Sequence, residues 1–139
     1  MARIKAIITS TLILLANTHI VEGLGINCRG STYCFFDNDK INLREADTLR
    51  WFINAIDAGR WYNNGEQIAC TPAQICAFLQ NTGGTWGSKI KQLAPYIPNH
   101  GCTSCGSVPY YYPEGNNNVA DGQLTFNYVS SPKCENGLC

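Results

Sequence analysis

The chain has 139 residues, with ten Lys and Arg against ten Asp and Glu, eight cysteines and a hydrophobic content of 45%. A neutral chain with only 14% charged residues lacks the basic face that nucleic-acid-binding proteins use to neutralise phosphates. Its hydrophobic content is also too high for an intrinsically disordered chain, so we expect one small, cysteine-rich globular domain.

Residues 1–23 have the pattern of a secretory signal peptide. Two basic residues precede an apolar stretch over residues 6–16, and a polar segment then ends at Gly23. The stretch is shorter than the roughly 20 apolar residues that span a bilayer. We therefore expect cleavage after Gly23 and a mature domain of residues 24–139, which is secreted and does not insert into membranes.

The first expected element of the mature chain is a helix over residues 43–58. Asn42 and Glu45 have the spacing of a capping box, and Gly59 supplies a stop signal. The apolar residues between them recur at helical spacing. The predicted inward-facing residues are Leu49, Phe52, Ile53 and Ile56.

Residues 66–82 allow two interpretations. Thr71 and Pro72 could cap and open a helix that runs to Gln80. Alternatively, residues 67–70 and 75–80 are the two strands of a hairpin that turns at Thr71 and Pro72. Local signals alone do not choose between the helix and the hairpin.

The remaining elements point to a mixed fold. Residues 86–94 can form a second helix, whose continuation Pro95 and Pro98 limit. Residues 108–112 have the composition of a strand, and residues 123–129 alternate between apolar and polar side chains as a half-buried strand does. Helices combined with antiparallel strands predict an α+β domain of two layers.

The cysteines predict four disulfides, because an even number in a small exported domain is typical of a disulfide framework. Cys102 and Cys105 have the spacing of a zinc-ligand or redox pair. No second such pair exists, and His100 is the one histidine of the mature chain, so we expect no metal and no cofactor. The cysteines are Cys28, Cys34, Cys70, Cys76, Cys102, Cys105, Cys134 and Cys139.

Catalytic patterns are weak in this chain. A histidine-based nuclease needs a second acid or base, and His100 has no histidine partner. Paired carboxylates for sugar hydrolysis could come from several acidic residues, but no sequence pattern sets two of them across a cleft. These acidic residues are Asp37, Asp39, Glu66 and Asp121. We therefore expect a protein that is not an enzyme.

Several blocks along the mature chain resemble the KP-four killer toxin family, which is known from a virus of smut fungi and from cellular relatives. The resemblance begins at residues 24–31 with Cys34, continues through residues 99–109, and ends at residues 122–129 with Cys134. These blocks stand in the same order as in the family. The expected signal-peptide cut falls where the mature chains of that family begin.

The resemblance implies a two-layer α/β sandwich, in which helices pack on one face of an antiparallel sheet and disulfides staple the fold. It assigns residues 75–80 to a strand and so favours the hairpin over the capped helix. It also implies the disulfides Cys28–Cys102 and Cys34–Cys105. The other four cysteines allow three pairings, and the sequence does not choose among them.

The function that the resemblance implies is that of a secreted, monomeric toxin. Such a protein inhibits competing or host cells from outside, and its partner is a protein of the target-cell surface, namely a calcium channel. The alternative is a non-toxic secreted binding module that uses the same scaffold for a cell-wall or host-protein ligand. The two can be separated by measuring growth and calcium uptake of exposed cells.

The viral toxin has a basic stretch before the cysteine that matches Cys70, whereas this chain has Glu-Gln-Ile-Ala at residues 66–69. We therefore expect weaker channel blocking, and expect lysine at Ile68 or Ala69 to raise inhibition. The candidate target-contact residues are Lys89, Lys91, Arg60 and Trp61.

Overall fold

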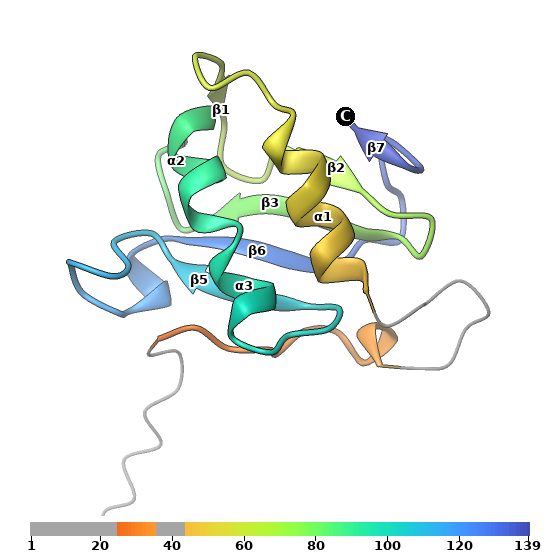
Figure 1. Ribbon diagram of the computed structural model, residues 1–139, viewed down its shortest axis with the longest axis horizontal. Helices are drawn as coiled ribbons and strands as arrows, with labels where there is room; N and C mark the ends of the chain where they lie inside the picture. Colours follow the sequence, from red (N-terminus) through yellow and green to blue (C-terminus); the bar gives the residue numbers. More distant parts are fainter. Residues whose placement is uncertain (1–24, 36–43) are drawn as a thin grey trace, which may run out of the picture.

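The computed structural model describes residues 25–35 and 44–139, which form an α+β domain (Figure 1). The expected signal peptide and Asn42 lie outside the described residues. The elements in chain order are the 3-10 helix η1 (Thr32–Cys34), α1 (Glu45–Asn54), β1 (Trp61–Tyr62), β2 (Ala69–Cys70), β3 (Ile75–Gln80), β4 (Thr85–Trp86), α2 (Gly87–Leu93), α3 (Tyr96–Asn99), β5 (Gly106–Pro109), the 3-10 helix η2 (Val119–Asp121), β6 (Gln123–Tyr128) and β7 (Gly137–Leu138).

Five strands form the main sheet in the order β5-β6-β3-β2-β7, and every neighbouring pair is antiparallel. The longest pairing joins β3 to β6, from Ile75 opposite Tyr128 to Gln80 opposite Gln123. A second sheet of two strands joins β1 to β4. Because β2 and β3 pair directly, the hairpin interpretation of residues 66–82 is confirmed.

The core lies between the main sheet and the helices, which cover one face of that sheet (Figure 1). Apolar side chains at alternate positions of β3 and β6 meet the inward faces of α1 and α2, because side chains of a strand point alternately to its two faces. Fully burying one large aliphatic side chain stabilises the fold by about 1.5–3 kcal/mol. The largest of these side chains are Leu49, Ile53, Ile75, Leu79, Ile90, Leu93, Leu124 and Phe126. The expected two-layer α/β sandwich is confirmed.

The helix expected over residues 43–58 is shorter in the structure and spans Glu45–Asn54. After Asn54 the winding tightens, because the amide of Ala55 donates to the carbonyl of Phe52 and that of Ile56 to the carbonyl of Ile53. These bonds reach back three residues, as in a 3-10 turn. Ile56 stays buried, so the apolar pattern predicted its burial correctly and the end of the helix incorrectly.

The strand expected over residues 108–112 is displaced toward the N-terminus and spans Gly106–Pro109. Ser107 exchanges backbone hydrogen bonds with Asn27, and the β5 residues pair with β6. The chain then turns, because the amide of Tyr112 donates to the carbonyl of Pro109. The helix expected over residues 86–94 is confirmed as α2, and Pro98 lies in the first turn of the short α3, where a helix needs no amide donor.

All eight cysteines form disulfides. Cys28–Cys102 and Cys34–Cys105, the two pairs that the resemblance implied, fasten the N-terminal segment to the region before β5. The four cysteines whose pairing was open join as Cys70–Cys76, across the β2–β3 pair, and Cys134–Cys139, in the tail that holds β7. Within residues 25–35 and 44–139, no helix combines the length and the apolarity that crossing a membrane requires.

Candidate functional site

The two-stranded sheet of β1 and β4 presents a pair of exposed tryptophans. Trp61 and Trp86 are direct cross-strand partners, and their ring centroids lie 5.2 Å apart with the planes at 82°. The next residues of the strands, Tyr62 and Thr85, point the other way and are buried. Strand alternation therefore puts both indoles on the outer face, where they are 44% and 52% exposed.

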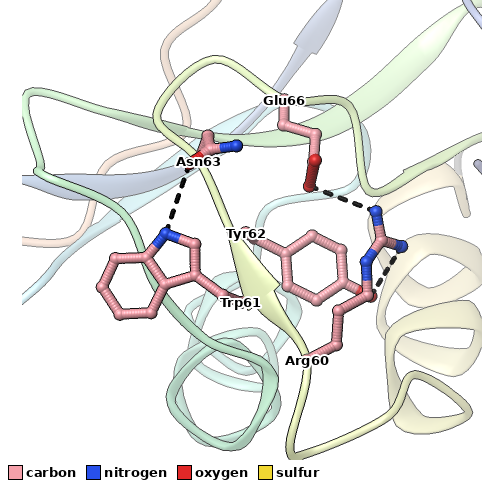
Figure 2. A network of polar contacts seen from close by, with 5 residues as sticks. All are labelled: Arg60, Trp61, Tyr62, Asn63 and Glu66. Atoms are coloured by element: carbon pink, nitrogen blue, oxygen red, sulfur yellow. Dashed lines mark hydrogen bonds and ion pairs between the residues drawn. The ribbon is translucent and has the colours of Figure 1, made fainter.

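Arg60, which directly precedes β1, is held on the other side of this strand by a small polar network (Figure 2). Its guanidinium carbon lies 4.3 Å from the centroid of the Tyr62 ring, and Nη1 donates to the Tyr62 hydroxyl over 3.4 Å. Nη2 forms an ion pair of 3.4 Å with Oε2 of Glu66. On the opposite side of β1, Nε1 of Trp61 donates to Oδ1 of Asn63 over 3.3 Å. Arg60 thus offers an oriented cation whose charge Glu66 partly offsets.

Lys89 and Lys91, the two candidate lysines, contact different neighbours of α2. Nζ of Lys89 lies 5.2 Å from the centroid of the Tyr110 ring. Nζ of Lys91 instead donates to the carbonyl of Ile56 over 2.9 Å, just beyond the C-terminal end of α1. A cation there satisfies a carbonyl that lacks a helical partner. Lys91 therefore has a structural role, and Arg60 with Trp61 is the more accessible part of the predicted set.

The segment that replaces the family's basic stretch is mostly buried. Ile68 is 2% exposed and Ala69 is fully buried, so a lysine at either position would carry its charge into the core. The premise of the lysine expectation, that residues 68 and 69 lie on the contact surface, is therefore wrong. Glu66 is the acidic residue of the segment, its side chain is 28% exposed, and its partner is Arg60. Residues 66–69 contain no basic side chain, but the structure places the Arg60 guanidinium beside them through its ion pair with Glu66.

Some surface aromatics were missed by sequence reasoning. Trp86 is 52% exposed as the cross-strand partner of Trp61, and Tyr110 and Tyr111, the latter 50% exposed, line a cleft together with the loop between β3 and β4. The alternation at Trp61–Tyr62 and Thr85–Trp86 is the signal that could have found the tryptophan pair. It extends over two residues in each strand, which is too short for a pattern to be read with the sequence alone.

Of the residues considered for catalysis, those that the structure describes make separate structural contacts. His100 is exposed just after α3, and its backbone amide donates to the carbonyls of Tyr96 and Ile97. Glu66 pairs with Arg60, and Asp121 accepts a hydrogen bond of 3.0 Å from Asn116. Asp37 and Asp39 lie outside the described residues.

Three sulfur atoms gather near the C-terminal tail. Those of Cys70, Cys134 and Cys139 lie within 4.8 Å of one another, which is close enough for shared metal ligation. Each belongs to a disulfide, whereas a metal ion is bound by thiolates. In this oxidised state the three sulfur atoms crosslink the chain.

The fold is that of a small α/β sandwich held together by four disulfides. A family model described as Kp4 matches residues 11–130. The KP4 killer toxin of Ustilago maydis P4 virus is 33% identical over 129 residues, which cover 90% of this chain and 95% of the relative. The chain belongs to the Kp4 family, and the resemblance found in the sequence is confirmed.

Proposed function

We propose that this protein is a secreted, monomeric killer toxin that inhibits competing or host cells by blocking a calcium channel from outside. The observation that carries the proposal is the similarity to a killer toxin along nearly the whole chain. Export is supported by the signal-peptide pattern of residues 1–23 and by four disulfides, which persist in oxidising compartments. On this proposal the protein neither inserts into the membrane nor acts as an enzyme.

Arg60 is the cation that we assign to the channel. Acidic rings at the mouth of a cation channel attract a protruding positive group. The Arg60 side chain is 47% exposed, and its stacking on Tyr62 limits the rotamer entropy lost when it binds. Glu66 competes for the same guanidinium, and we therefore expect weaker blocking than by a toxin whose contact cation is unpaired.

The test measures growth and calcium uptake of a panel of fungal and plant cells exposed to the purified protein. Inhibition should be relieved by added calcium. Arg60→Ala should weaken inhibition of calcium uptake roughly tenfold, as is typical when one interfacial charge is lost. Glu66→Gln should strengthen it, because the substitution frees the guanidinium from its ion pair.

Arg50→Ala is the matched control, because it removes an equal charge from an exposed position on α1. It should leave inhibition unchanged. If the wild-type protein alters neither growth nor calcium uptake in any cell tested, the toxin function is refuted. Growth arrest without any change in calcium uptake would instead refute the channel as the target.

A further inference from the structure

A polar cleft lies at one end of the main sheet, beside the exposed tryptophans. Gln80 at the end of β3 pairs with Gln123 at the start of β6, and Gln123 also pairs with Pro109 at the end of β5. The loops over residues 81–84 and 110–122 therefore leave the sheet at the same end (Figure 1). The first of them leads directly into β4, which carries Trp86.

The two loops enclose a shallow cleft of about 280 Å³. Nδ2 of Asn81 donates to the carbonyl of Val119 over 3.2 Å, which fixes the amide and leaves its oxygen as an acceptor. Oδ2 of Asp121 accepts from Asn116 over 3.0 Å, which leaves the second carboxylate oxygen. The lining residues are Asn81, Thr82, Gly83, Gly84, Tyr110, Tyr111 and Asp121.

Aromatic rings flank this cleft, and the backbone holds them in place. Gly84 has a φ of +97°, and a Cβ added there would lie 2.9 Å from two atoms of the Trp61 indole. Trp61 therefore packs directly against the loop that lines the cleft. Among the lining residues, the Tyr111 ring stands at 78° to that of Tyr110, with centroids 5.0 Å apart, and the Tyr110 hydroxyl hydrogen-bonds Thr85 over 2.9 Å.

The charges around the cleft favour an uncharged ligand. None of the lining residues is basic, and Asp121 is acidic. Arg60 is paired with Glu66, and Nζ of Lys89 lies over the Tyr110 ring and is not among the residues that line the cleft. A phosphate or an anionic lipid headgroup would meet the Asp121 carboxylate here, and the lining itself supplies no cation to offset that repulsion.

We propose that this cleft, together with the Trp61–Trp86 pair and Tyr111, binds a neutral polysaccharide of the cell surface. A pyranose ring presents an apolar C–H face, which stacks on an exposed aromatic ring, and hydroxyl groups at its edge. Asn81 and Asp121 supply fixed acceptors for those hydroxyls. Because the rings and the polar groups are already held in position, little conformational entropy is lost when the glycan binds.

The test mixes the purified full-length mature protein with insoluble chitin, β-1,3-glucan or mannan and measures its depletion from solution. At least one polymer should deplete the wild type in a saturable manner. Trp61→Ala and Asp121→Asn should each weaken this binding roughly tenfold, as for loss of one central contact. Trp51→Ala is the control, since Trp51 is 73% exposed on α1 and lines a different groove, and it should bind as the wild type does.

Tyr111→Ala provides a second variant in case Trp61→Ala does not fold, and circular dichroism checks both. The proposal is overturned if none of the three polymers binds, or if Trp51→Ala loses as much binding as the cleft variants. Binding to vesicles that contain phosphatidylserine but to no polysaccharide would also overturn it. Growth inhibition and calcium uptake are measured in separate assays, so the result on glycan binding does not depend on whether the protein is toxic.

Discussion

The two long-range disulfides connect the same pair of segments, and this makes their contributions to stability strongly non-additive. Cys28–Cys102 and Cys34–Cys105 join residues 74 and 71 positions apart. Either bridge alone already closes the long loop of the unfolded chain. Once one bridge exists, the other closes only a short ring, because residues 28 and 34 are six positions apart and residues 102 and 105 are three apart, which gives a loop length of about nine.

The chain-entropy relation gives the magnitude. Closing a 74-residue loop stabilises the fold by about 4.4 kcal/mol, and closing a nine-residue ring by about 2.6 kcal/mol. Replacing either pair by alanines should therefore cost about 2.6 kcal/mol, whereas replacing both should cost about 7 kcal/mol. The stability lost in the variant without both bridges exceeds the sum of the two single losses by about 2 kcal/mol. This excess is large beside the free energy of unfolding of a typical domain, which is about 5–15 kcal/mol.

Urea unfolding of the three variants, extrapolated to water, measures these losses. Alanine is used because a serine hydroxyl would be unpaired at Cys34, Cys102 and Cys105, which are buried. The control replaces Cys134 and Cys139, which close a loop of separation 5 in another part of the chain, and its loss should add to that of either long-range pair. If the variant without both bridges loses only as much free energy of unfolding as the two single variants together, the shared-loop reasoning is refuted. A variant without both bridges that is already unfolded in the absence of urea agrees with it.

Three further substitutions test the packing by thermal unfolding. Ile68→Lys should cost more than about 3 kcal/mol, because its ammonium would be buried without a partner, and an unchanged melting temperature would contradict the burial of this segment. Lys91→Met should cost about 1 kcal/mol, since the carbonyl of Ile56 loses its donor; melting together with the wild type would argue against that hydrogen bond. Gly84→Ala should cost more than about 1 kcal/mol, because φ is positive and the new Cβ would lie 2.7 Å from the carbonyl oxygen of Tyr62, and a stability equal to the wild type would rule out this loop geometry.

Where one element has a long enough pattern, the sequence predicts it well. The alternation over residues 123–129 predicts β6, and the apolar spacing after Asp47 predicts the inward face of α1. One part of the β6 prediction fails, because Thr125 belongs to the expected polar face and is nevertheless buried. Its hydroxyl donates to Gln80 over 2.8 Å and lies 3.4 Å from that of Ser107, so neighbouring strands cover it.

The surroundings of β1 show why a candidate site is harder to predict than an element. Arg60 and Trp61 were chosen as a cation beside an aromatic, which is a local feature of the chain. Trp86 joins them only because β1 pairs with β4, and Glu66 joins them because the chain returns past Arg60. Such neighbours depend on strand pairing, which a local pattern does not encode.

By itself, the sequence determined the disulfide-rich α+β class, the similarity to killer toxins and the existence of four disulfides. Composition, cysteine number and periodicity are properties of the chain that any fold must satisfy. Only the tertiary structure decided the pairing of Cys70 with Cys76, because that bond requires the register that sets these residues opposite each other across β2 and β3. It also decided that Ile68 is a core residue, since burial depends on which elements pack over a strand and not on the four residues around it.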